Sequence, residues 1–415
     1  MGGAHAHGPA PDVGIDRRAR FVLLGSLLLA AVLTVAGMVA LWPAADERPA
    51  EVPFAGDGVR EVSAEVVAVA DPCPVIAVDP ALPTPPGGER PDFPDGCGSV
   101  TVTVEGSEEP VTIQPPPYVA RAGLQAGDGV SLLALPAQDG VPPQYAFVAI
   151  DRGQPVAVLA VAFVVVVALV ARLRGLLALL GLGIAGLVLA FFVLPALLAG
   201  RDGFTVAAVG SSAIMFVVLY LAHGPSLRTS AALAGTLLGV GATALIGLWG
   251  IDRARLAGIG ESGEQLLLYA PDLDYQGLLA AAVVIAGLGV LNDVTITQAS
   301  AVWELRAAAP GLGRRQLFTS GMRIGRDHIA STIYTIVFVY AGAALSVLML
   351  IALYDRPLLS ALGEEAIAEE VVRTLASAIG LVLAVPLTTG IAALTVSGPV
   401  SGPVSGPARA GAAEG

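Results

Sequence analysis

The chain has 415 residues, 55% of them hydrophobic and only 13% charged, and its mean hydropathy is +0.76. Because a soluble domain carries about 25% charged residues, this composition excludes a soluble globular protein, a disordered chain and a disulfide-dense small protein. The net charge of −12 and the isoelectric point of about 4.8 argue against a nucleic-acid-binding protein. The composition predicts an α-helical polytopic membrane protein with one water-exposed insert.

Apolar segments of membrane-spanning length occur along most of the chain. A helix that crosses the hydrocarbon core needs about 20 apolar residues. Eight segments approach or exceed that length, namely 21–42, 155–171, 176–198, 204–222, 230–250, 277–303, 329–354 and 374–396. The apolar run of the first segment is longer than the core of a signal peptide, so we expect an uncleaved anchor there. The sequence thus predicts about eight transmembrane helices, with seven of them in 155–396.

Arginine distribution predicts the topology. All 22 basic residues are arginine, and with the many Ala, Gly, Val and Pro this is typical of a GC-rich bacterial genome. One set of loops holds most of the arginines, and the loop expected at 306–326 is the richest, whereas the opposite loop at 355–373 carries four glutamates. By the positive-inside rule, the N-terminal 1–20 lies in the cytoplasm and the insert at 43–154 lies outside the bacterial plasma membrane.

The outer insert has the pattern of a small β domain. Alternating residues between Pro- and Gly-rich joints predict strands at 61–70, 99–105, 110–114, 129–135 and 145–151. Five short strands favour a β-barrel-like domain of the OB type. Cys73 and Cys97, the two cysteines of the chain, predict one disulfide there, with two free thiols as the alternative. Residues 397–415, rich in Ser-Gly-Pro-Val, predict a disordered cytoplasmic tail.

The sixth apolar segment contains polar side chains that are costly in a membrane. Asp293 and Thr297 lie on one helical face, and Asn292, Thr295 and Gln298 form an adjoining stripe. A carboxylate at such a position takes up a proton or binds a cation, so we predict a functional Asp293. For the amide and hydroxyl stripe two interpretations stay open, which are lining of a transport path and hydrogen bonding between helices.

Two further polar positions are candidates. Asp327 and His328, with Thr332 one turn later, open the seventh apolar segment, where an Asp next to a His forms a possible proton relay. Stabilisation of a helix N-terminus by Asp327 is the alternative. His223 precedes a helix-breaking Gly-Pro pair, which is typical of transporter sites and equally of a structural turn. We expect these side chains and Asp293 to form one cluster in the cytoplasmic half of the helices.

Motifs for chemistry on nucleotides, metals or esters do not occur. The sequence has no G-x-x-x-x-G-K-[ST], H-E-x-x-H or G-x-S-x-G motif, so we expect no nucleotide, no metal site, no cofactor and no enzyme activity. Gly235 and Gly239 match the G-x-x-x-G pattern of close helix packing.

The same polar segments carry a family resemblance. The chain resembles the YibE/F family of bacterial membrane proteins in five segments, which are 171–182, 191–200, 217–239, 287–305 and 325–343. The strings LNDVTITQ and GRDHI are specific to this resemblance. It implies a multi-pass membrane protein, but it assigns no catalytic or binding residue, because the molecular function of the family is not established. In its Asn-Asp pair before an arginine-bearing loop, the chain is also similar to accessory subunits of the Sec translocase.

Two functional hypotheses follow. The first is an ion- or proton-coupled transporter of unknown substrate, with Asp293 as the coupling carboxylate and the other polar residues as its path or gate. The second is a non-transporting envelope scaffold or export-accessory protein, whose 43–154 domain binds an envelope protein. An intramembrane enzyme ranks last, because no catalytic constellation is found.

Overall fold

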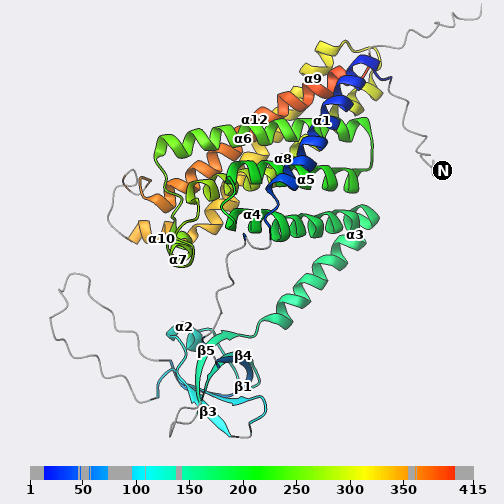
Figure 1. Cartoon of the computed structure of the whole chain (residues 1–415). Helices are drawn as coiled ribbons and strands as arrows, with labels where there is room; N and C mark the ends of the chain where they lie inside the picture. The colour runs from blue at the N-terminus through cyan, green and yellow to red at the C-terminus, as the bar shows by residue number, and fades with distance from the viewer. Residues whose placement is uncertain are drawn as a thin grey trace, which may run out of the picture. The chain divides into compact units, whose positions relative to one another are not determined.

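The computed structural model describes residues 14–44, 47, 56, 58–72, 96–107, 109–136, 143–353, 360 and 362–397. It contains two compact units, Glu51–Leu169 and the combination of Met1–Ala50 with Val170–Gly415. Figure 1 shows a curled sheet in the first unit and a helical bundle in the second. Cys73 and the tail from 398 onward lie outside the described residues, while Cys97 is disulfide-bonded.

The described helices account for most of the predicted spans. Six candidate membrane-spanning helices are found in the described part of the chain, or seven if α9 and α10, which meet at a 72° bend, form one span. The helices are α1 (Arg17–Leu41), α2 (Pro117–Arg121), α3 (Gly153–Val188), η2 (Leu189–Val193), α4 (Leu194–Leu198), α5 (Gly203–His223), α6 (Leu227–Ala254), α7 (Glu261–Tyr269), α8 (Tyr275–Ala308), α9 (Arg314–Ala343), α10 (Leu345–Leu353) and α12 (Glu365–Thr395).

The difference from eight spans arises at α3. The predicted segments 155–171 and 176–198 lie in one candidate span, Gly153–Leu198, of 46 residues. At 1.5 Å per residue this helix is about 69 Å long, more than twice the hydrocarbon core of about 30 Å. Its backbone leaves the helical conformation at Arg172, where φ is 52° and ψ is −140°. The helix is therefore long enough for two spans and is broken between them.

The prediction of a loop over residues 306–326 is wrong, because most of this segment is helical. The structure leaves only five residues, 309–313, between α8 and α9. Pro310 and Gly311 end α8, because proline cannot continue a helix and glycine favours turns. The side chain of Gln316 then accepts a hydrogen bond from the Gly313 N–H at 3.1 Å, which satisfies a free donor at the start of α9. The arginine-rich segment that follows contains no proline and continues as helix.

Small residues set the register of three central helices. On α6, Gly235 lies against Thr388 of α12, and Gly239 lies against Leu291 of α8 and Ala384 of α12. The predicted close-packing motif thus contacts two helices at once. Further along α6, Gly247 lies against Val283 of α8, so α6 runs antiparallel to α8.

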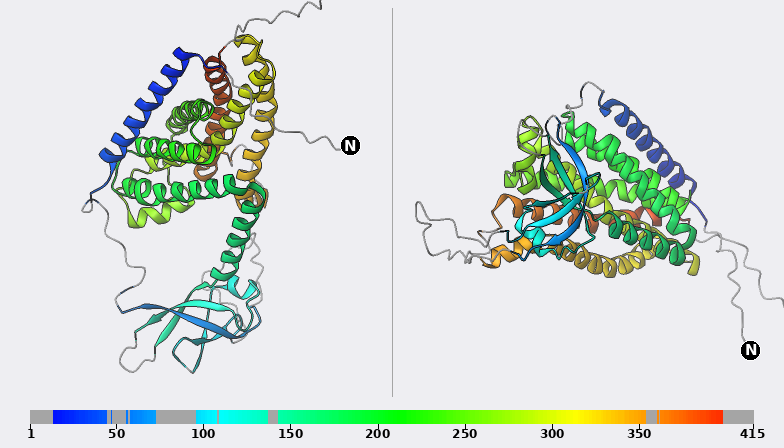
Figure 2. Two further views of the ribbon diagram at one scale, coloured as in Figure 1. Left: turned by 90° about the vertical axis from the view of Figure 1, so that its right-hand side faces the viewer. Right: turned by 90° about the horizontal axis from the view of Figure 1, so that it is seen from below.

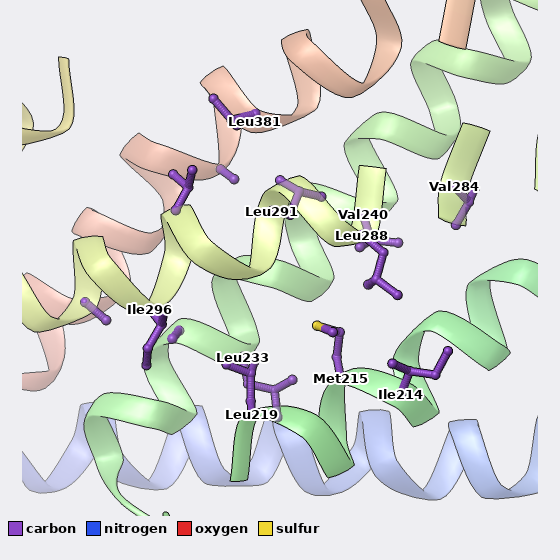
Figure 3. Packing of buried hydrophobic residues seen from close by; sticks show 14 of the residues in the cluster. Ile214, Met215, Leu219, Leu233, Val240, Val284, Leu288, Leu291, Ile296 and Leu381 are labelled. Atoms are coloured by element: carbon purple, nitrogen blue, oxygen red, sulfur yellow. The ribbon is translucent and has the colours of Figure 1, made fainter. Parts of the chain in front are cut away.

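The apolar core surrounds the contacts between α6, α8 and α12. Figure 3 shows side chains from α5, α6, α8 and α12 meeting there. Ile214, Met215 and Leu219 of α5 belong to one buried cluster with Leu233 of α6 and Leu291 of α8. The cluster fixes the positions of the polar side chains on α8.

A glycine pair on α6 tests this packing. We expect Gly235→Ala to lower the free energy of unfolding by about 1–3 kcal/mol, because its Cβ would overlap the Thr388 side chain. Gly241→Ala on the same helix is the control, since no atom lies within 4 Å of its Cβ position and alanine favours helix by up to about 1 kcal/mol. Thermal unfolding in detergent compares the two variants. Equal destabilisation by both would contradict the described register.

Three helix ends meet at one end of the bundle. Asp16 donates its backbone N–H to the Thr395 carbonyl at 3.0 Å and pairs with Arg314 at 2.5 Å, which joins the starts of α1 and α9 to the end of α12. The Ala19 N–H and the Arg314 guanidinium hold the pKa of Asp16 below its usual range. The first turns of α1 and α9 make this end of the bundle rich in arginine. Because α6 runs antiparallel to α8, the start of α6 lies at this arginine-rich end as well.

The β unit is a curled antiparallel sheet. Its strands are β1 (Arg60–Val69), β2 (Val100–Val104), β3 (Pro110–Ile113), β4 (Gly129–Leu135) and β5 (Gln144–Ile150). The strand order is β3-β2-β1-β4-β5, and Figure 2 shows the curl of the sheet. Irregularities between Val66 and Ala68 and between Ser131 and Leu132 interrupt the register, and such bulges increase twist. The five predicted strands are confirmed.

Candidate functional site

Asp293 and His328 come together across two helices. Asp293 lies on α8 and His328 on α9, and Asp293 Oδ2 lies 3.9 Å from His328 Nε2. The histidine side chain is 27% exposed, and its Nε2 is buried with no hydrogen-bond partner among the described residues. The aspartate side chain is 76% exposed on the outer surface of the helical unit. The distance is longer than a direct hydrogen bond, so one bridging water would complete the pair.

The position of Asp327 within α9 excludes one interpretation. The helix begins at Arg314, thirteen residues before Asp327, so this carboxylate does not stabilise a helix N-terminus. Asp327 itself is exposed. Thr332 donates its hydroxyl hydrogen bond to the His328 carbonyl at 2.9 Å, one turn along the same face. Thr332 therefore lies one turn from His328, and its described hydrogen bond is to the backbone and not to the Asp293 or His328 side chain.

Two further polar residues of α8 flank the aspartate. Asn292 is half-buried, and its Oδ1 has no hydrogen-bond partner in the described part of the chain. Thr297, one turn after Asp293, is exposed. With His328, these side chains give α8 and α9 a shared polar surface, for which contact with lipid would be unfavourable.

Thr295 and Gln298 point into the bundle instead. Thr295 is completely buried, and its Oγ1 lies 2.6 Å from the Thr236 Oγ1 of α6. Gln298, 2% exposed, donates from Nε2 to the Gly321 carbonyl at 2.8 Å and to the Thr389 hydroxyl at 2.7 Å. Gln298 thereby joins α8 to α9 and α12. These contacts are interhelical hydrogen bonds, one of the two interpretations left open by the sequence.

Two glycines of α9 bring the histidine helix close. A Cβ at Gly325 would lie 2.6 Å from Val385 of α12 and 3.1 Å from Gln298 Oε1. A Cβ at Gly321 would lie 2.9 Å from the Thr389 methyl group. Sequence reasoning missed this second G-x-x-x-G pair, although the string GMRIG carries the same signal as Gly235 and Gly239. The pair sets how closely α9 approaches α8.

His223 does not join this group. It ends α5, and Ser226 then caps α6 ten residues before Thr236, which contacts Thr295. At 1.5 Å per residue, His223 lies about 15 Å along the bundle from the level of Thr295. The predicted single cluster thus contains Asp293 and His328 but not His223.

The described residues around the pair do not form a group of metal ligands. In the part of the chain that the structure describes, no three His, Cys, Asp or Glu side chains are grouped to hold a metal ion. The chemistry available at Asp293 and His328 is proton uptake, proton release and charge pairing.

Comparison with known proteins identifies the family. The family model described as YibE/F-like protein matches residues 159–398, which is more than half of the chain and includes both α8 and α9. No curated protein and no solved structure matches the chain. The match and the apolar helices identify a membrane protein. The resemblance found in the polar segments is confirmed, and the chain belongs to the family of YibE/F-like proteins.

Proposed function

We propose that this protein is a proton-coupled transporter of the bacterial cytoplasmic membrane, with Asp293 as its coupling carboxylate. One observation carries the proposal, which is the carboxylate–imidazole pair that Asp293 of α8 forms with His328 of α9. An ionisable side chain at membrane depth is costly and is typical of ion pathways. The substrate is a solute whose movement the proton gradient drives.

The pair supplies a plausible exchange site. Imidazole is the side chain whose ordinary pKa lies closest to neutral, which suits histidine to the exchange of protons in such pathways. A protonated His328 next to an ionised Asp293 is a neutral pair, which lowers the cost of holding charge in an apolar region. Transfer of a proton from His328 to Asp293 leaves the pair neutral, and release of that proton to one side of the membrane or uptake from the other changes its charge by one unit without a large movement.

The other polar residues have separate parts in this proposal. Asn292, Thr297 and Thr332 line the path next to the pair, Asp327 acts as a gating group beside His328, and His223 acts as a gating group at the arginine-rich end. Thr295 and Gln298 hold α6, α8, α9 and α12 together, as their buried hydrogen bonds support.

The proposal includes eight spans, with both chain ends inside and an OB-type domain outside. The break at Arg172 supports two spans in the 46-residue helix. The arginine-rich starts of α1 and α9 lie at one end of the bundle with the end of α12, which supports a cytoplasmic assignment for that end. The helix between β3 and β4 and the partly open sheet support an OB-type domain.

Proton flux into sealed liposomes tests the proposal. Purified protein is reconstituted with a pH-sensitive dye inside, and a pH gradient is imposed. We expect the wild type to dissipate the gradient and Asp293→Asn to reduce the flux at least about tenfold. Glu304→Gln, an exposed glutamate on the same helix, removes the same charge and should leave the flux unchanged.

The scaffold hypothesis gives the opposite result. It is favoured by the separate hydrophobic core of the β unit, which contains Val66, Val102 and Leu132. A scaffold leaves wild-type and Asp293→Asn liposomes equally tight under every gradient tested. In that case the transporter proposal fails, and lesions in the sheet abolish function instead.

A further inference from the structure

A second polar site lies well apart from Asp293 and His328. An open cavity of about 800 Å³ is lined by the start of α8, the end of α9, α10, the first turns of α12, and α7 with the segment before it. Its α9 wall begins at Val337, nine residues beyond His328, or about 14 Å along the helix. Most of the lining is apolar, as at Leu278, Val347 and Ile351. Its volume lies in the range of small-molecule sites, about 300–1,000 Å³.

Two carboxylates and one guanidinium interrupt the apolar lining. Glu370 accepts a hydrogen bond from Arg373 at 2.7 Å, so these two charges neutralise each other. Glu369 is 8% exposed, and its Oε1 has no hydrogen-bond partner among the described residues. Glu370 Oε1 is likewise buried and unpartnered. Glu369 also lies beside the Glu365 carboxyl group, so carboxyl groups outnumber the one guanidinium here, and the two Oε1 atoms are acceptors without a partner among the described residues.

The backbone beside the carboxylates is built to hold them. Glu365 accepts hydrogen bonds from the N–H groups of Ala257 at 2.5 Å and Gly258 at 3.2 Å, which ties this segment to α12. Gly258 has a φ of +77°, a conformation that favours glycine. A Cβ at Gly260 would lie 2.7 Å from Glu369 Oε2, so the absence of a side chain there lets this carboxylate lie close to the backbone. The carboxylate is thus positioned by fixed backbone.

We infer that this cavity binds a hydrophobic organic monocation, with Glu369 as its charge partner. A buried carboxylate that lies beside a second carboxylate, with one oxygen lacking a hydrogen bond, is unfavourable, and a cationic ligand lowers that cost. A hydrated metal ion would need six or more oxygen ligands, which the apolar walls do not offer. A neutral ligand leaves the charge uncompensated, and an anion adds to it. An ammonium or phosphonium group attached to apolar substituents matches both the charge and the walls.

Equilibrium binding of radiolabelled tetraphenylphosphonium to the full chain in lipid nanodiscs tests this inference. We expect saturable binding that Glu369→Gln weakens at least about tenfold. Glu369→Asp, which keeps the charge, should bind more tightly than Glu369→Gln. The neutral analogue triphenylmethanol should not compete. Glu304→Gln, the same charge change elsewhere, should bind as the wild type does.

A second variant separates ligand contact from misfolding. Ala341→Phe adds bulk to the α9 wall without touching the carboxylates, and we expect it to weaken binding as well. Unaltered thermal unfolding of both variants supports the site. Equal affinities for the wild type and Glu369→Gln, or equal competition by triphenylmethanol, would overturn the inference. Because binding is measured without a gradient, its outcome is independent of the proton flux proposed for Asp293.

Discussion

His328→Gln should reduce proton flux into liposomes as strongly as Asp293→Asn does, by at least about tenfold. The reason is geometric. His328 Nε2 is buried, has no hydrogen-bond partner among the described residues and lies 3.9 Å from Asp293 Oδ2, so a proton can be exchanged between the two side chains after a small movement. Glutamine keeps approximate size and polarity but does not titrate near neutral pH. Loss of flux would therefore report the lost protonation step rather than a lost helix contact.

The double variant tests whether Asp293 and His328 act as one unit. Groups that act as one unit give non-additive losses, so Asp293→Asn with His328→Gln should show the flux of either single variant. The four proteins are compared at one imposed gradient, with reconstitution efficiency measured for each. Losses that multiply would show two independent groups, and a wild-type rate for His328→Gln would remove histidine from the path. Glu304→Gln is again the charge control.

Local patterns predicted much of the fold. The alternation in 99–105 places Val100, Val102 and Val104 on one face of β2, and the structure buries these three side chains. Gly-Pro at 224–225 correctly separated α5 from α6. Such features depend on neighbouring residues, so a single sequence contains the necessary information.

Features that depend on distant segments were harder to predict. The length of α9 was missed because its first turns are polar and arginine-rich, a composition typical of both a cytoplasmic loop and a helix extended beyond a membrane. The pairing of Asp293 with His328 depends on Gly321 and Gly325, which let α9 approach α8 and α12. Asp293 and His328 were both recognised, but their distance depends on packing between helices.

The cavity at Glu369 was harder still to predict from the sequence, because distant segments form it. Its walls come from segments around 258–282, 337–351 and 362–375. The periodicity within one segment does not predict that all three line the same cavity. The glutamates of 364–370 were assigned by charge to an outer loop, where solvent would surround them. The structure instead starts α12 at Glu365 and buries Glu369, because the helix continues beyond its apolar part.

Gln298→Ala should lower the free energy of unfolding by about 3–6 kcal/mol, the largest stability effect that we expect at this site. Removal of a buried side chain of this size costs about 2–5 kcal/mol through the cavity it leaves. Loss of two interhelical hydrogen bonds adds roughly 0.6 kcal/mol each in a membrane protein. Because Gln298 joins α8 to both Gly321 and Thr389, the variant should also loosen α9 and reduce proton flux.

Two matched variants separate the cost of the cavity from the cost of the lost hydrogen bonds. Gln298→Leu keeps most of the volume, so its cost of about 1–2 kcal/mol isolates the hydrogen bonds. Thr297→Ala, at the adjacent exposed position, should change stability by less than about 0.5 kcal/mol. Thermal and denaturant unfolding in one detergent measure all three. A wild-type stability for Gln298→Ala would show that α9 is held to the bundle without this side chain, and the described route by which packing sets the Asp293–His328 distance would then be wrong.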